Sequence, residues 1–217
     1  ISLEFAIQPE PRGIAEALLI GESFLRDKPS ALILGDNLFH GLSLSERLLN
    51  VSKQNSRACV FGYSVKDPER YGVIKLDSNE GIEDIVEKPS YFVSNYAITG
   101  LYFYDNTASE RTKSLKPSKR GELEITDLNK SYLKDDLLSV EIMTEGMTWL
   151  DTGTFDSLHE ASSYVQIIEH RQGLKIGCPE EVALKKNWID KNDIERIAFQ
   201  RGKNSYGKYL LNLSKKP

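Results

Sequence analysis

The chain has 217 residues, 40% hydrophobic and 28% charged, with a formal net charge of −4. This length and composition fit one large globular domain, or one domain with an appendage. The acidic balance argues against nucleic-acid and membrane-surface binders, because such proteins need basic footprints to neutralise phosphates. No stretch reaches the roughly 20 apolar residues of a membrane span. Cys59 and Cys178 have no metal or redox spacing, so we expect reduced thiols in a cytoplasmic protein.

Strand-like and helix-like patterns alternate along the first part of the chain, as in an α/β sheet with crossover helices. Residues 1–8 predict a strand, and the apolar spacing that begins at Ile14 predicts a helix over residues 14–26. The apolar run at residues 31–34 predicts a strand buried on both faces. Residues 44–54 are expected to be helical, and "RACVFGYSV" is expected to form the next interior strand.

The middle of the chain predicts an antiparallel excursion from the main sheet. The stretches "YGVIKLD", "GIEDIVEKP" and "YAITGLYFYD" are short strand patterns joined by turn residues. Helical spacing resumes in "GELEITDLNKSYLKDD", whose inward residues should be Leu123, Ile125, Leu128, Tyr132 and Leu133.

The last third predicts a strand and turn in "LSVEIMTEGM" and then mainly helices. A helix should run from Asp156 to about Arg171 and stop at Gly173, and short helical patterns should fill residues 180–216. We therefore expect a mixed α/β domain flanked by helices over residues 1–177. A helical segment should follow over residues 178–217.

Two aspartates follow apolar runs, where open α/β sheets place their ligands. Asp36 comes after "ALIL", and Asp151 stands in "TWLDTG" beside Trp149, which we interpret as packing. Two carboxylates at separate strand ends could hold one Mg²⁺, a hard ion that prefers oxygen ligands. Simpler interpretations remain open, because Asp36 also fits a turn and Asp151 also fits a helix cap.

The stretch "DIVEKP" places Glu87 and Lys88 at the end of a predicted strand. An ammonium there could hold a phosphate, and the carboxylate could accept hydrogen bonds from sugar hydroxyls. An exposed Glu-Lys turn is the alternative interpretation, because both residue types are common at protein surfaces.

Seven stretches occur in a familiar order: "IQPEPRGIAEA", "LILGDN", "DPERYGV", "VEKP", "ITGLYFYD", "KPSKRGELEITDLN" and "WLDTGT". Together they resemble the bacterial glucose-1-phosphate thymidylyltransferases, members of the sugar nucleotidyltransferase family. The resemblance runs from residue 1 to about Gly207. Each stretch alone is weak, whereas the ordered set is specific. It implies a Rossmann-like nucleotidyltransferase fold.

The resemblance also implies a reaction: dTTP and glucose 1-phosphate give dTDP-glucose and pyrophosphate. By the same resemblance Asp36 and Asp151 would bind Mg²⁺, which would neutralise phosphate oxygens. Lys88 would bind the phosphate of glucose 1-phosphate, and Arg120 in "SKRGELE" would be a second phosphate contact. Lys88 and Arg120 are thus the predicted catalytic residues. A solvated arginine before a helix is the alternative for Arg120.

Substrate-binding roles follow for five further positions. Gln8 and Gly13 would read the thymine, since an amide can satisfy a pyrimidine edge and glycine permits close backbone approach. Gly72, Glu87 and Tyr102 would form the glucose site. Taken alone, Gln8 and Gly13 fit a polar strand end and a helix start, and Tyr102 fits a packed strand aromatic.

The chain departs from the family in two places. Members open with a loop of the form G-G-x-G-T-R-L and a lysine in K-x-L-x-P, and neither occurs here. We therefore expect a chain without its amino-terminal portion, two strand-helix units of about 30 residues each or more, and leave its own activity open. The second departure is Lys185, where members carry arginine in a tail linked to tetramers and to feedback inhibition by dTDP-rhamnose.

Two rival functions remain. One is a nucleotidyltransferase with another base or sugar specificity, which would share the metal acids and differ at the turn that reads the base. The other is a non-catalytic subunit that binds sugar nucleotides, which the missing loop favours.

Overall fold

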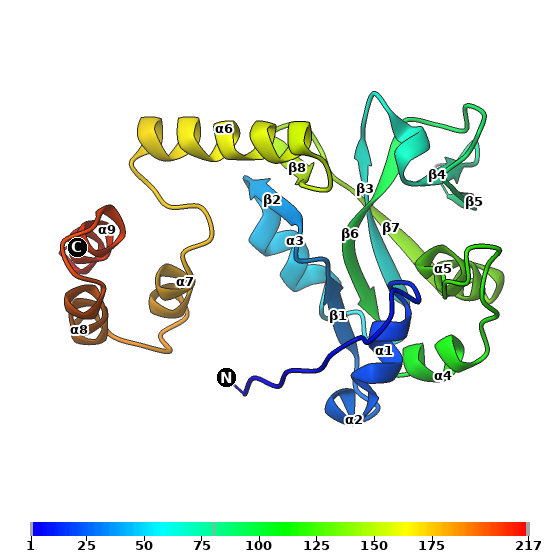
Figure 1. Cartoon of the computed structure of the whole chain (residues 1–217), viewed down its shortest axis with the longest axis horizontal. Helices are drawn as coiled ribbons and strands as arrows, with labels where there is room; N and C mark the ends of the chain where they lie inside the picture. The colour runs from blue at the N-terminus through cyan, green and yellow to red at the C-terminus, as the bar shows by residue number, and fades with distance from the viewer. Residues whose placement is uncertain (1, 80, 216–217) are drawn as a thin grey trace. The chain divides into compact units, whose positions relative to one another are not determined.

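The computed structural model describes residues 2–79 and 81–215 (Figure 1). The chain divides into two compact units, Ile1–Leu150 and Asp151–Pro217. This division differs from the expected boundary after residue 177, because it assigns α6 (Phe155–Gln172) to the second unit.

The first unit is built on one mixed sheet. Its strands are β1 (Ser30–Ile33), β3 (Ala58–Ser64), β4 (Gly72–Leu76), β5 (Ile82–Glu87), β6 (Tyr96–Tyr104) and β7 (Leu138–Ile142). The order is β5-β4-β6-β3-β7, and β1 pairs with β6 as well. The β3–β7 pair is parallel, whereas β4, β5 and β6 pair antiparallel. The predicted mixed sheet and the antiparallel pairing of its middle strands are confirmed. These strands belong to the main sheet, however, and do not form an excursion from it, because β6 pairs directly with β3.

Strand β6 is the central strand of this sheet. It pairs with β3 along one edge, and with β4 and β1 at different points along its length. Tyr102 lies opposite both Leu32 of β1 and Val60 of β3. A strand paired on both sides has its backbone groups satisfied by neighbours, which suits the apolar pattern of β6.

Two apolar clusters cover the two faces of the sheet. Alternate residues of β3 divide between them, with Ala58 and Val60 in one cluster and Cys59 and Phe61 in the other. The first cluster includes residues of the helices α1 (Glu16–Ile20), α2 (Glu22–Leu25), α4 (Ala108–Lys113) and α5 (Ile125–Lys134). The second includes α3 (Leu44–Val51) and a small sheet formed by β2 (Asn37–Gly41) and β8 (Met147–Asp151).

Two predictions about strands near the start of the chain are wrong. Residues 2–8 form no strand, and Leu3, Phe5 and Ile7 are 76%, 95% and 86% exposed; Ile1 lies outside the described residues. The alternating pattern was misleading because a strand also needs a neighbour for its backbone groups, and no described strand pairs with this segment. The prediction that residues 31–34 are buried on both faces also fails, since Ile33 is 61% exposed.

The helix predictions were more accurate. The helix expected over residues 14–26 is present but divided at Gly21 into α1 and α2. Helix α5 buries Ile125, Leu128 and Tyr132, as predicted. Helix α6 stops at Gly173, whose φ of 63° lies in the left-handed region that glycine tolerates. The sequence reasoning missed α4 and β2, both short.

The second unit contains α6, α7 (Pro179–Lys185), α8 (Lys191–Arg201) and α9 (Ser205–Ser214). Cys178, Ile194, Ala198 and Leu210 form a small core among α7, α8 and α9. Thr154 caps α6 with its side chain, and Asp190 and Asn204 do the same for α8 and α9. Lys185 is exposed and pairs with Glu181 at 2.8 Å.

A buried polar network anchors α5 to the end of β6. The Oδ1 atom of Asp105 accepts hydrogen bonds from Tyr132 OH at 2.6 Å and from the Thr107 backbone N and Oγ1 at 2.8 and 2.7 Å. Burial acts against ionisation, but the hydrogen bonds from Tyr132 and Thr107 outweigh it and lower the pKa of Asp105. The carboxylate is therefore held in its charged form.

Replacing Tyr132→Phe should destabilise the first unit by about 1.5–3 kcal/mol at pH 7, because a hydrogen bond to a charged group is lost. The lowered pKa of Asp105 makes its contribution present above the unfolded value of about 3.9 and lost as the pH falls through the folded value. The deficit of the variant should therefore shrink below about pH 4. Urea denaturation at pH 7 and pH 3 measures both values.

Tyr104→Phe is the matched control, since Tyr104 OH donates to the neutral amide of Asn129 at 2.8 Å. The loss in free energy of unfolding caused by Tyr104→Phe should be the same at both pH values. An equal deficit for Tyr132→Phe at both values would contradict the assignment of the effect to Asp105.

Candidate functional site

Glu87 ends β5 and is held in place by two other segments. The Thr126 Oγ1 atom donates a hydrogen bond to Glu87 Oε2 at 2.5 Å. Gly72 lies opposite Glu87 in the β4–β5 pair. A Cβ atom at Gly72 would lie 3.1 Å from Thr126 Oγ1 and 3.3 Å from Glu87 Oε2. Glycine at this position therefore leaves room for the hydrogen bond between these two side chains.

Lys88 follows directly and has an unusual backbone conformation. Its φ of 40° is in the left-handed region, which is uncommon for a long side chain. The backbone N of Lys88 donates to Tyr71 O at 3.0 Å, and the next residue is the buried Pro89. Strained residues of this kind cluster at ligand sites because the surrounding structure must hold them in place. The side chain itself is exposed.

Arg120 lies in the loop before α5 and pairs with two carboxylates. Its Nη2 atom is 2.8 Å from Glu124 Oε2 and 3.3 Å from Glu122 Oε2. Burial acts to raise the pKa of Glu124, but hydrogen bonds from Ser118 and Arg120 outweigh it and lower that pKa. Lys88 contributes to the same lowering, so "VEKP" and "SKRGELE" lie within electrostatic reach.

Tyr102 lies in β6, within electrostatic reach of Glu87. It is 4% exposed and stacks on Tyr104 with a centroid separation of 6.1 Å. Burial, reinforced by the charge of Glu87, raises the pKa of Tyr102, so its hydroxyl stays protonated. The ring packs in the core cluster, and its predicted contact with a sugar stays a prediction.

Gln8 and Gly13 lie close together before α1. Gln8 Nε2 donates to Gly13 O at 3.1 Å and to Glu16 Oε2 at 2.7 Å. Gly13 has a φ of 98°, and a Cβ there would collide with the backbone of Leu123. The close approach that requires glycine is therefore an approach to the chain's own loop. Thymine binding by Gln8 and Gly13 stays a prediction.

The two predicted metal ligands flank the small sheet. Asp36 precedes β2 and is exposed, and Asp151 is the last residue of β8. Asn37 Nδ2 donates to Asp36 Oδ1 at 2.8 Å. Trp149 packs edge-on against Tyr63 and Tyr71 with centroid separations of 6.0 and 5.0 Å. Its indole also donates to Asn37 Oδ1 at 2.6 Å, a role beyond the predicted packing.

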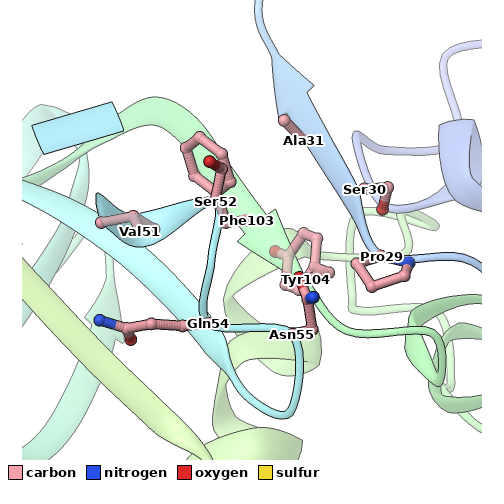
Figure 2. A pocket seen from close by; sticks show the side chains of 9 residues that line it. All are labelled: Pro29, Ser30, Ala31, Val51, Ser52, Gln54, Asn55, Phe103 and Tyr104. Carbon is pink, nitrogen blue, oxygen red and sulfur yellow. The ribbon is translucent and has the colours of Figure 1, made fainter. Parts of the chain in front are cut away.

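A different hollow opens at the other end of β1 (Figure 2). Its volume is about 180 Å³, and it is lined by Pro29 to Ala31, by Phe103 and Tyr104, and by the end of α3 and the residues that follow it. Ligand pockets usually hold about 300–1,000 Å³, and ligands of α/β sheets bind outside the carboxyl ends of strands. We therefore place the candidate site at the end of β1 that leads to Asp36.

Sequence reasoning missed three polar side chains of this region. Thr126 holds Glu87, Glu124 holds Arg120, and Asn37 holds Asp36. Glu124 and Thr126 lie inside the predicted helix pattern, and Asn37 follows Asp36 in the stretch that also fits a turn. The distance along the chain explains the omission of Thr126, which is 39 residues from Glu87.

Replacing Arg120→Gln should raise the pKa of Glu124, because the variant removes the cationic partner while the burial that opposes ionisation remains. A carboxyl-detected NMR titration measures this shift. Arg12→Gln is the control, since Arg12 pairs with Glu10 at 2.8 Å on an exposed segment. An unchanged Glu124 titration in the Arg120 variant would show that the ion pair does not form in solution.

The sequence matches the Nucleotidyl transferase family over residues 1–167. It is 51% identical over 216 residues to the glucose-1-phosphate thymidylyltransferase of Xanthomonas campestris pv. campestris strain B100, covering 100% of this chain and 73% of that protein. The corresponding protein of Neisseria gonorrhoeae is 51% identical over 213 residues, covering 98% of this chain and 74% of that protein.

Solved structures support the same relationship. A Bacillus anthracis protein assigned as a glucose-1-phosphate thymidylyltransferase and crystallised with a sucrose superposes with a TM-score of 0.68 at 40% identity. The match covers 76% of this chain and 65% of that one. A UDP-glucose pyrophosphorylase complexed with UDP-glucose gives 0.65 at 27% identity, covering 72% and 63%. The chain thus spans about two thirds of these structures and belongs to the glucose-1-phosphate thymidylyltransferases, a family of nucleotidyl transferases.

Proposed function

We propose that this chain binds dTTP and glucose 1-phosphate and forms dTDP-glucose and pyrophosphate. A phosphate oxygen of the sugar phosphate attacks the α-phosphorus of dTTP, and the bond from that phosphorus to the bridging oxygen breaks. The electron pair leaves with pyrophosphate. Both substrates are anionic, so alignment and charge neutralisation supply most of the rate enhancement.

The observation that carries this proposal is the arrangement around Glu87. Its carboxylate is fixed by Thr126, lies beside Gly72 and is followed by the strained, exposed Lys88. A fixed carboxylate is a suitable acceptor for sugar hydroxyls, and the adjacent ammonium suits a phosphate. Sugar recognition and phosphate recognition are thus available from consecutive residues.

Arg120 completes the phosphate contacts in this proposal. Because Arg120 is paired with Glu122 and Glu124, a phosphate must exchange with a carboxylate that already occupies the guanidinium. The five N–H donors of arginine allow one edge to keep Glu124 while another binds phosphate. Lys88 and Arg120 would then neutralise the sugar phosphate as it approaches the nucleotide.

The proposed thymine-reading pair is Gln8 and Gly13. In the free chain Gln8 Nε2 is engaged by Gly13 O and Glu16, so base binding would exchange these partners for the edge of the pyrimidine. The amide oxygen and nitrogen can match the donor and acceptor of thymine. Selection of thymine over uracil would rest on one methyl group, which discriminates modestly.

We propose Mg²⁺ as the cofactor, held by Asp36 and Asp151. The donor set fits, since both side chains offer the oxygen ligands that this ion prefers. Among residues 2–79 and 81–215 no cluster of three or more Asp, Glu, His or Cys side chains forms a metal site. Magnesium commonly uses one or two carboxylates and completes its shell with waters and substrate phosphates. When bound, it would neutralise the phosphate charge.

The assembly and location are also proposals. A homotetramer is expected from the resemblance, and size-exclusion chromatography with light scattering measures it. No helix within the described part of the chain is long and apolar enough to cross a membrane. The cytoplasmic location predicted from the two reduced cysteines stays a prediction.

Pyrophosphate release tests the proposed reaction. The purified chain with dTTP, glucose 1-phosphate and Mg²⁺ should turn over, and Asp36→Asn or Asp151→Asn should each lower the rate at least a hundredfold because a charge that binds the metal is lost. Asp156→Asn, an exposed acid in the first turn of α6, should leave the rate unchanged. Faster turnover of UTP would favour the rival base specificity.

Well-folded protein that binds dTDP-glucose without releasing pyrophosphate would contradict the catalytic proposal. That outcome would favour the binding subunit instead.

The sugar site is tested by Thr126→Val, which removes the hydroxyl that orients Glu87 while keeping the shape of the side chain. The dissociation constant for glucose 1-phosphate should rise about tenfold, because one hydrogen bond to a charged group is lost. Isothermal titration calorimetry measures it. Thr112→Val is the matched control, since Thr112 Oγ1 donates within α4 to Ala108 O at 2.7 Å. Equal dissociation constants for glucose 1-phosphate in both variants would contradict a place for Glu87 in the sugar site.

A further inference from the structure

Asn37 is the meeting point of three segments beside Asp36. Its Oδ1 atom accepts one hydrogen bond from Gly100 N at 3.1 Å and another from Trp149 Nε1 at 2.6 Å. Its Nδ2 atom donates to Asp36 Oδ1 at 2.8 Å. Strand β6, strand β8 and the start of β2 therefore all converge on a single amide group.

The two donors determine which way this amide faces. A backbone N–H and an indole N–H can only donate, so the atom that they both contact must be the amide oxygen. Turning the amide over would place Nδ2 against two N–H groups and leave an oxygen facing the Asp36 carboxylate. Each of those contacts would be repulsive. The side-chain NH₂ group of Asn37 is therefore held toward Asp36.

Packing fixes the indole that makes one of these bonds. Trp149 is 5% exposed, and the rings of Tyr63 and Tyr71 contact it edge-on. Gly100 provides the space for the amide, since a Cβ atom there would lie between 2.6 and 2.9 Å from the side-chain atoms of Asn37. Gly100 lies inside β6, so this steric conflict is the reason for glycine at that position.

We infer that Trp149, acting through Asn37, is a positioning residue that orients the Asp36 carboxylate. The inference rests on the proposed function, in which Asp36 is a metal ligand. Neither Trp149 nor Asn37 needs to touch the substrate for this role. Partners that orient a ligating carboxylate commonly change metal affinity tenfold or more when they are removed.

The hydrogen bond itself can be observed in the unmodified chain. The chain has two tryptophans, Trp149 and Trp188, so its ¹H–¹⁵N spectrum contains two indole signals, and Trp188→Phe assigns them. Trp188 is 63% exposed and its indole proton should exchange rapidly with water. The Trp149 proton should exchange at least a hundredfold more slowly. Equally rapid exchange of both protons would overturn the inference without requiring any variant of Trp149.

The effect on the carboxylate is tested with Mn²⁺ alone as the probe, titrated by electron paramagnetic resonance. Trp149→Phe keeps an aromatic ring and removes the N–H, and Gly100→Ala inserts a methyl group against Asn37. Both should weaken Mn²⁺ binding about tenfold, while Trp188→Phe binds as the unmodified chain does. Dispersed amide spectra establish that the variants are folded.

Asp36→Asn separates the two ways in which this experiment can fail. If Asp36→Asn weakens Mn²⁺ binding but Trp149→Phe and Gly100→Ala do not, the positioning role is overturned and the metal site stands. If Asp36→Asn binds Mn²⁺ as well as the unmodified chain, the metal site of the proposed function is wrong. The positioning role then fails with it.

Discussion

The pairing of β6 on both of its edges is the constraint on which the first unit depends. Its nine residues lie beside β3 along one edge and beside β4 and β1 along the other. This arrangement satisfies its backbone and buries both of its faces. It also brings Gly100 against Asn37 and buries Tyr102 in the core. Through Asn37, the Asp36 part of the candidate site is therefore attached to the central strand of the sheet.

Each of three acids in the candidate region accepts a hydrogen bond from another side chain of the protein. Glu87 is held by Thr126, Asp36 by Asn37, and Glu124 by Arg120 and Ser118. Each holding group comes from the chain near the acid or from another segment packed against it, and each donates to a carboxylate oxygen. Groups whose orientation is fixed before the substrate arrives lose little entropy on binding. A site for two anions benefits most, because its charges must be aligned rather than simply present.

Glycine has a steric role at two positions of this site. Gly72 leaves space between Thr126 and Glu87, and Gly100 leaves space for the amide of Asn37. Neither position has a positive φ, so side-chain volume decides the residue rather than backbone freedom. Gly13 differs, because its φ of 98° and its approach to Leu123 both require glycine.

The sequence by itself determined the mixed α/β class, most helices and the candidate residues Asp36, Glu87 and Lys88. Local periodicity and turn chemistry carry that information, because they act between residues near one another in the chain. The order of the seven quoted stretches also indicated the family, and the comparisons with known proteins confirmed it.

Only the tertiary structure decided which polar groups meet. Thr126 reaches Glu87 across 39 residues, and Trp149 reaches Asn37 across 112. Strand pairing likewise decided that residues 2–8 remain unpaired despite their alternating pattern. Such contacts depend on which segments the sheet brings side by side, and hydrophobic periodicity carries no information about a partner so distant along the chain.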